Sequence, residues 1–148
     1  MNILICRWDI FVYPDILDTM KNEGHLCDVL DFSAIKMSDE DIASFSKVLE
    51  DKLCEKTSEK ETKYDAVFSV NFFSYIAGCF VCHRQNIRYI CYNVDSPLLN
   101  MQHPSVNYKT NCIYTFDSSE EKHFNNKGTD TVHYLPLCTN TKRVQALI

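Results

Sequence analysis

The sequence predicts an α/β fold in which helices cover both faces of a parallel sheet of about six strands. Six short runs rich in β-branched and aromatic residues alternate with segments in which apolar residues recur at helical spacing. Such strict alternation with short connections is typical of parallel strands joined by right-handed crossovers. We therefore expect one three-layer, doubly wound, Rossmann-like domain with the strand order 3-2-1-4-5-6.

The predicted strands share a short apolar core that is bounded by polar or turn-forming residues. The run Tyr64–Val70 is apolar enough to be covered on both faces, as expected inside a parallel sheet. The six predicted strands are 2–6, 26–32, 64–70, 88–93, 111–116 and 131–135.

The helices between these strands are marked mainly at their ends. Ser38 and Ser118 each open a four-residue pattern that ends in an acidic residue, which indicates a capping box at a helix start. Gly24 and Gly128 follow helical segments and are predicted to close them. Segment 73–85 is apolar nearly all round and predicts a largely buried helix.

Length and composition restrict the class of protein. A chain of 148 residues, 45% hydrophobic and 24% charged, has the size and composition of one globular domain. We place this domain at 1–140 and the start of an interdomain linker or tail at 141–148. The net charge of −5 and the lack of a basic stripe give nucleic-acid binding no electrostatic support. No apolar run reaches the roughly 18 residues of a membrane span.

Eight cysteines would suggest disulfides in a small secreted protein, but two observations favour reduced thiols. The chain leads from its first residues straight into a predicted strand, without an export signal. Cys6, Cys27, Cys91 and Cys112 lie inside predicted strands, where free thiols act as small apolar side chains. The sequence therefore predicts a cytoplasmic protein.

Familiar cofactor and phosphorylation patterns fit this chain poorly. The glycine-rich fingerprint of NAD, FAD or P-loop sites is missing after the first strand, where the chain reads Cys6-Arg-Trp-Asp-Ile-Phe11. A receiver domain needs an acidic pair after the first strand and an aspartate after the third strand. This chain has Arg7-Trp8 and Asn71 at those places. The run Cys79-Phe-Val-Cys82-His83 matches a haem attachment pattern but lies in the predicted buried helix. No second ligand pair has zinc spacing, so we expect neither a metal nor a cofactor.

Polar side chains gather where the predicted strands end. Because ligands of open α/β sheets bind at the carboxyl ends of the strands, these residues form the candidate site. Asp95 follows a central strand and precedes Ser96-Pro97, a predicted helix start. Each residue also has a structural alternative, since Asp95, Ser96 and Asp117 can cap helices and Trp8 can close the core. The candidates are Arg7, Trp8, Asp9, Asn71, Asn93, Asp95, Ser96 and Asp117.

Four segments, in order along nearly the whole chain, carry a resemblance to a known family. They are Ile3-Leu-Ile-Cys-Arg-Trp8, Tyr64-Asp-Ala-Val-Phe-Ser-Val-Asn-Phe-Phe73, Ile87-Arg-Tyr-Ile with Asp95-Ser-Pro-Leu-Leu99, and Tyr134-Leu-Pro-Leu137. These segments resemble the N-terminal domain of bacterial glycosyltransferases similar to the spore maturation protein CgeB.

The resemblance implies the N-terminal Rossmann-like half of a GT-B glycosyltransferase, in which two such domains face each other across a cleft. A C-terminal half, expected beyond residue 148, would hold the nucleotide-sugar, and this half would shape the acceptor side. Asp95, and after it Asp9, are then the candidate catalytic bases. We expect no metal-binding Asp-x-Asp motif of the other glycosyltransferase fold, so transfer should be metal-independent, and it should need both halves. The candidates on the substrate side are Arg7, Trp8, Asn71, Asn93, Ser96 and Asp117.

The alternation of strands and helices also fits another class of protein. This alternative is a non-catalytic flavodoxin-like or receiver-like module that binds a partner. A second α/β domain further along the native gene would favour the enzyme, and a natural stop near residue 148 would favour the module.

Overall fold

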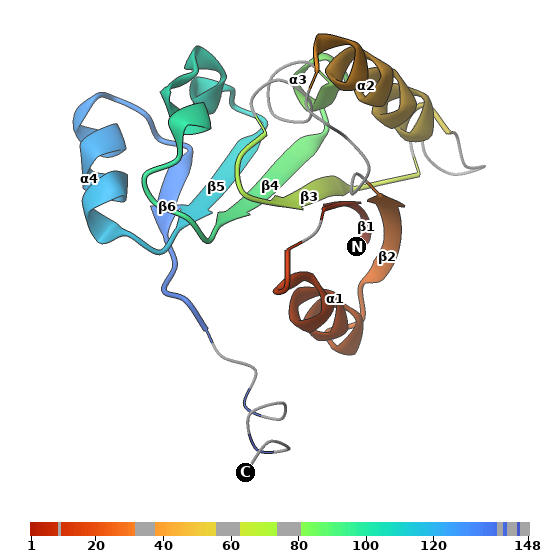
Figure 1. Cartoon of the computed structure of the whole chain (residues 1–148), viewed down its shortest axis with the longest axis horizontal. Helices are drawn as coiled ribbons and strands as arrows, with labels where there is room; N and C mark the ends of the chain where they lie inside the picture. The colour runs from red at the N-terminus through yellow and green to blue at the C-terminus, as the bar shows by residue number, and fades with distance from the viewer. Residues whose placement is uncertain are drawn as a thin grey trace.

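A computed structural model gives the structure of the chain and describes residues 1–8, 10–31, 38–55, 63–73, 81–138, 141 and 145. Six strands form one parallel sheet (Figure 1). The strands are β1 (Asn2–Arg7), β2 (Leu26–Asp31), β3 (Ala66–Val70), β4 (Arg88–Asn93), β5 (Asn111–Thr115) and β6 (Val132–Tyr134). The predicted α/β class and its all-parallel sheet are confirmed.

Helices connect these strands in the described part of the chain. The α-helices are α1 (Tyr13–Asn22), α2 (Asp39–Leu53), α3 (Cys82–Arg84) and α4 (Ser118–Asn126), and two 3₁₀ helices are η2 (Leu99–Gln102) and η3 (Pro104–Asn107). Of the predicted helix over 73–85, residues 74–80 lie outside the described residues. Asp9 and most of the predicted tail at 141–148 lie outside them as well.

The strand order is β2-β1-β3-β4-β5-β6, and the predicted order 3-2-1-4-5-6 is wrong. Strand β1 pairs with β2 on one side and with β3 on the other, so that Ile5 lies opposite both Val29 and Phe68. The cause is burial. All five residues of β3 are buried, whereas β2 contains no buried residue and carries two aspartates. A wholly buried strand belongs in the centre of a sheet, and a strand with charged residues belongs at an edge.

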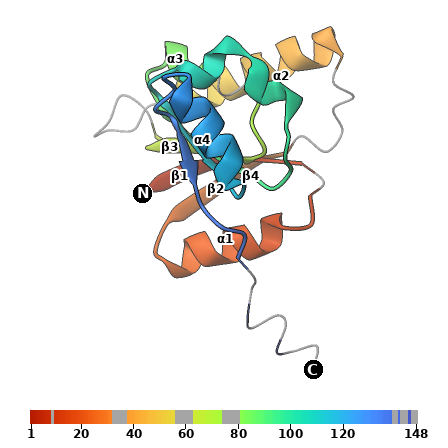
Figure 2. The same cartoon turned by 90° about the vertical axis from the view of Figure 1, so that its left-hand side faces the viewer.

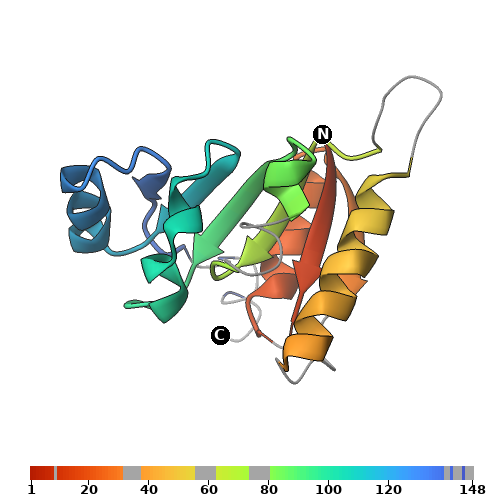
Figure 3. The ribbon, with the colours of Figure 1, turned by 90° about the horizontal axis from the view of Figure 1, so that it is seen from above.

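The two faces of the sheet are covered unequally. Helices α2, α3 and α4, together with η2 and η3, lie on one face, and α1 lies on the other (Figures 1 and 2). The larger core cluster is on the first face, where Leu49 and Leu53 of α2 pack with Tyr89 of β4. The view from above shows α2 and α3 lying over the strands, with α1 behind them (Figure 3). The smaller cluster joins Ile3 and Phe68 to α1.

Helix ends follow the predicted signals in part. Ser38 caps the N-terminus of α2 as predicted, because its hydroxyl accepts a hydrogen bond from the backbone N–H of Asp41 at 3.2 Å. The cap of α4 lies one residue earlier than the predicted box, since Asp117 accepts from the backbone N–H of Ser119. Glycines at 24 and 128 adopt positive φ of 82° and 84° just after α1 and α4, as predicted.

The helix predicted to start at Ser96-Pro97 does not form. Residues 95–97 make a bend with a cis Ser96-Pro97 peptide, and only the short η2 and η3 follow. Pro104 explains why no longer helix runs here. A proline disfavours helical backbone at the residue before it, and His103 is accordingly extended, with ψ of 138°.

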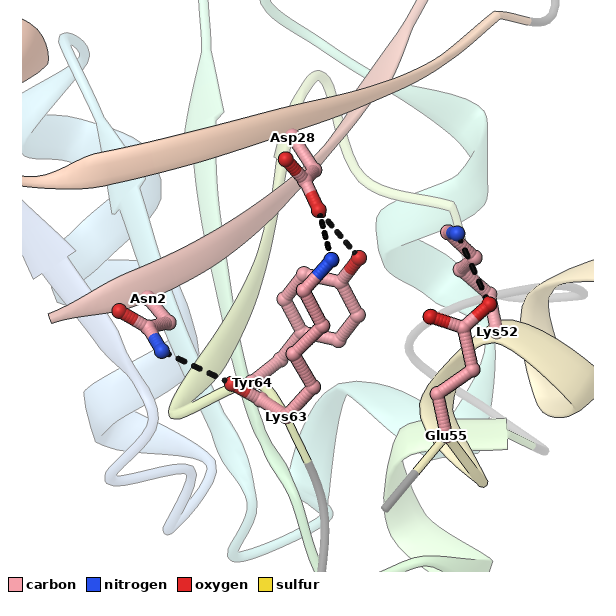
Figure 4. Close-up of polar contacts among 6 residues, drawn as sticks. All are labelled: Asn2, Asp28, Lys52, Glu55, Lys63 and Tyr64. Atoms are coloured by element: carbon pink, nitrogen blue, oxygen red, sulfur yellow. Dashed lines mark hydrogen bonds and ion pairs between the residues drawn. The ribbon is translucent and has the colours of Figure 1, made fainter. Parts of the chain in front are cut away.

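A cluster of polar contacts fastens β2 to the entry of β3 (Figure 4). One carboxylate oxygen of Asp28 accepts from the ammonium of Lys63 at 2.6 Å and from the hydroxyl of Tyr64 at 2.7 Å. The amide of Asn2 donates to the backbone carbonyl of Lys63 at 3.1 Å. These hydrogen bonds lower the pKa of Asp28, and burial first, then the Asp28 contact, raises the pKa of Tyr64 to about 12.

None of the helices in the described ranges has the length and apolar character needed to cross a membrane.

Candidate functional site

The carboxyl ends of β3 and β4 are tied together by one side chain, Asn71. This residue directly follows β3 and has a positive φ of 61°, a conformation that asparagine tolerates better than most residues. Its side-chain carbonyl accepts from the backbone N–H of Val94 at 2.9 Å, and its amide donates to a carboxylate oxygen of Asp95 at 2.7 Å. Asn71 therefore fixes both the bend after β4 and the direction of the Asp95 carboxylate.

A second carboxylate, that of Asp117, lies just after the neighbouring strand β5 at the same edge. The hydroxyl of Ser96 donates to Asp117 at 3.2 Å, which links the bend after β4 to the end of β5. Asp117 also accepts from the side chain and the backbone of Ser119 at 2.6 and 2.8 Å. Hydrogen bonds from Ser119 first, and then from Ser96, hold the pKa of Asp117 below its usual value. Asp117 is thus mainly a helix cap, as its structural alternative predicted.

The structure brings together Asn71, Asp95, Ser96 and Asp117, and we call these four residues the carboxyl-edge rim. Asp95 is exposed and the other three are partly exposed, so a ligand can reach their polar atoms. Asp95 does not cap a helix, because no helix begins there. Its exposed carboxylate can accept a hydrogen bond from a ligand.

Asn93, another predicted binding residue, lies inside the molecule. Its side chain is 0% exposed, and its carbonyl accepts from the thiol of Cys91 at 3.1 Å. The side-chain nitrogen has no hydrogen-bond partner among the described residues. Alternation along β4 places Asn93 on the same face as the buried Tyr89 and Cys91, which is a signal the sequence contained.

Arg7 ends β1 and Trp8 follows it, and both make contacts at the ends of other strands than β4 and β5. Arg7 forms an ion pair with Asp31 at the end of β2. The indole N–H of Trp8 donates to the backbone carbonyl of Val70 at 3.1 Å, and its ring packs on Phe73 with centroids 3.6 Å apart. Trp8 therefore closes the core between the ends of β1 and β3, in line with its structural alternative.

The observed strand order places the topological switch point between β1 and β3, where successive crossovers take opposite faces. The predicted order would have placed it between β1 and β4. A groove of about 420 Å³ lies between the end of β1 and the start of α1, and it is lined in part by Trp8 and by Phe11, which is 80% exposed. Phe11 was missed because an apolar residue in a loop gives no chemical signal in the sequence.

Tyr13, the first residue of α1, also contributes to the switch point. Its buried hydroxyl donates to the carbonyl of Cys6 at 2.5 Å and accepts from the N–H of Val70 at 3.0 Å. Burial raises the pKa of this hydroxyl. It therefore stays protonated and bridges β1 and β3 at the edge where the rim lies.

The cysteines of the described chain are free, and those in the core are poor nucleophiles. Burial raises the thiol pKa of Cys6, Cys82 and Cys91 well above the usual value. Cys27 and Cys112 are only partly buried, although both lie in strands. In the haem-like run, Cys79 lies outside the described residues.

Among the described residues, no group of three or more His, Cys, Asp or Glu side chains is placed so that it could hold a metal ion. The sequence Asp39-Glu-Asp41 has the spacing of a metal-binding Asp-x-Asp motif. The structure places it in the first turn of α2, where Asp41 takes part in the capping box with Ser38.

Comparisons with protein-family models, with curated proteins and with solved structures found no match to this chain. Fold and side-chain geometry together define an α/β protein with a polar, accessible rim at the carboxyl edge of its parallel sheet.

Proposed function

We propose that this chain is the acceptor-side domain of a GT-B type glycosyltransferase that uses a nucleotide-sugar donor. The observation that carries the proposal is the accessible Asp95 carboxylate, which Asn71 orients at 2.7 Å on the carboxyl edge of the sheet. Ligands of open parallel sheets bind at this edge. The sequence resemblance described above supports the same function.

Sugar transfer with inversion requires a base that removes the proton of the acceptor hydroxyl. In this proposal Asp95 is that base, and Ser96 and Asp117 contact the hydroxyl groups of the acceptor. A saccharide suits such a rim because its hydroxyls both donate to carboxylates and accept from amides. Asp9 remains a second candidate base.

A domain with one wall of a cleft cannot enclose a donor and an acceptor. Catalysis of transfer depends on excluding water and on positioning the two reactants, and both need a second domain opposite the rim. The proposed partners of this chain are therefore a C-terminal domain, a nucleotide-sugar and a saccharide acceptor.

The test is an NMR screen of the isotope-labelled chain with mono- and disaccharides and with uridine and thymidine diphosphate sugars. We expect a saccharide to shift the backbone amides of Asn71, Asp95 and Ser96, while the amides of Asp28 and Lys63 at the β2–β3 contact stay unchanged. If no sugar shifts the rim amides, or if the shifts map elsewhere, the glycosyltransferase proposal fails.

A second candidate function is a non-catalytic partner-binding module. The observation that favours it is the strand order, because 2-1-3-4-5 is the order of flavodoxin-like and receiver-like folds. The same NMR screen separates the two candidates, since such a module has no reason to bind saccharides at the rim.

A further inference from the structure

The groove between the end of β1 and the start of α1 has the size of a small-molecule site, at about 420 Å³. We call it the β1 groove. Its lining combines aromatic rings with one guanidinium group, so it is neither wholly apolar nor wholly charged. The lining residues are Arg7, Trp8, Ile10, Phe11, Tyr13 and Pro14.

Two side chains of this lining are fixed by contacts with the end of β3. The indole N–H of Trp8 donates to the carbonyl of Val70, and the Trp8 ring packs on Phe73. The hydroxyl of Tyr13 accepts from the N–H of Val70. One wall of the β1 groove is therefore held in place beside the strand that Asn71 follows.

The β1 groove and the carboxyl-edge rim lie on the same edge of the sheet, because both follow the carboxyl ends of parallel strands. Strands β1, β3 and β4 are neighbours in that order, so two strand spacings, or roughly 10 Å, separate the end of β1 from the end of β4. Asp95 lies just after β4. This separation exceeds the width of one sugar ring and suits two linked rings.

Phe11 and Arg7 give the β1 groove the chemistry of a sugar site. Phe11 is 80% exposed, and the face of an aromatic ring carries partial negative charge, which attracts the polarised C–H bonds of a pyranose. The side chain of Arg7 is 46% exposed and pairs with Asp31 through one nitrogen. A guanidinium has five N–H donors, so it can also donate to a sugar hydroxyl.

The charge of Asp31 decides between classes of ligand. An anion at Arg7 would meet the carboxylate that already pairs with this guanidinium, and like charges at close range repel each other. A purely apolar ligand would use Phe11 and leave the donors of Arg7 unused. A neutral ring with hydroxyl groups suits both side chains.

We propose that the β1 groove is a second sugar subsite, in which one ring of the acceptor stacks on Phe11 while a neighbouring ring presents its hydroxyl to the carboxyl-edge rim. The acceptor is then an oligosaccharide of at least two rings. This inference rests on the proposed function and narrows its substrate class. Phe11 and Arg7 bind the second ring, and neither takes part in proton transfer.

The test compares matched mono- and disaccharides, namely glucose with maltose and cellobiose, and galactose with lactose, by NMR titration of the rim amides. We expect a disaccharide to bind roughly tenfold more tightly than its monosaccharide and to shift the amide of Phe11 as well. Phe11→Ala should lower the affinity for the disaccharide to that for the monosaccharide and leave the latter unchanged. Phe11→Tyr, which keeps an aromatic face, should retain the preference.

Leu26→Ala is the matched control, because Leu26 is 70% exposed and begins β2, at the opposite edge of the sheet. It should bind every sugar as the parent chain does. Equal affinity of the rim for mono- and disaccharides, or a preference that survives in folded Phe11→Ala, would overturn this inference and leave the proposed function standing. Failure of every saccharide to shift the rim amides would overturn the proposed function, and this inference with it.

Discussion

At the carboxyl ends of β1 and β3, the hydroxyl of Tyr13 donates to the backbone carbonyl of Cys6 and accepts from the backbone N–H of Val70. Both bonds are buried, and Tyr13 is 3% exposed. A buried polar backbone group without a partner costs free energy comparable to a lost hydrogen bond. The hydroxyl of Tyr13 is therefore a structural group, although its position beside the switch point gives it the appearance of a catalytic one.

Tyr13→Phe should lower the free energy of unfolding by about 1–3 kcal/mol, because it leaves the Cys6 carbonyl and the Val70 N–H buried without a partner. Urea unfolding at neutral pH measures the change. Tyr134→Phe is the control, because Tyr134 is 47% exposed at the sheet edge. This substitution should leave the free energy of unfolding almost unchanged. Equal stability of Tyr13→Phe and the parent would show that the bridge contributes nothing.

Residue types alone predicted the carboxyl-edge rim only in part. Asn71, Asp95, Ser96 and Asp117 do lie together, because the carboxyl ends of parallel strands meet at one edge. Asn93 was wrongly expected there, because its chemistry was weighed without the alternation that turns it inward with Cys91. The bonds that orient Asp95 depend on the backbone conformation at Asn71, which no local pattern in the sequence indicates.

Strand positions were predictable and strand order was not. Each strand is a short apolar run, and each observed strand lies within its predicted range or extends it by one residue. The place of each strand in the sheet depends on how completely that strand is buried. The two aspartates of β2 and the uncharged, mostly apolar sequence of β3 contain that information, but the order most familiar for doubly wound sheets was preferred over it.

The contact between β2 and the entry of β3 should make stability depend on acid. Asp28 has a folded pKa below its unfolded value of about 3.9, so its contribution is complete at neutral pH and is lost as pH falls through the folded pKa. Unfolding at a series of pH values should therefore show Asp28→Asn less stable than the parent at pH 7, with the two curves converging in acid.

Asp51→Asn is the control for this series, because Asp51 is exposed on α2 and its substitution should leave the acid dependence of the parent intact. A constant difference between Asp28→Asn and the parent from pH 7 to strong acid would contradict the role given to the Lys63 and Tyr64 hydrogen bonds.

For the molecule as a whole, the polar rim lies at the open carboxyl edge of the sheet, and the two faces of the sheet are covered unequally (Figures 1 and 2). Sequence periodicity predicted that helices would cover both faces. It did not predict that one face would carry a single described helix, because each helix is assigned its face only through strand order.

The purified chain should neither transfer a sugar nor hydrolyse a nucleotide-sugar at an enzymatic rate. The physical reason is that an open rim does not exclude water or hold the donor against the acceptor. Release of free nucleotide from a panel of nucleotide-sugars is the measurement. Turnover in the ordinary enzymatic range of about 1–1,000 per second would show that the chain is a complete enzyme.

The most direct measurement is the affinity of the chain for the saccharide that shifts its rim amides, compared between the parent, Asp95→Asn and Asp51→Asn. Loss of a hydrogen bond to a charged group costs about 1.5–3 kcal/mol, so Asp95→Asn should bind roughly tenfold or more weakly. Its melting temperature should stay close to that of the parent, because Asp95 is exposed and asparagine can still accept from Asn71. Asp51→Asn should bind as the parent does. Undiminished binding by a folded Asp95→Asn chain, or no binding of any saccharide by the parent, would contradict the account of the carboxyl-edge rim as an acceptor site.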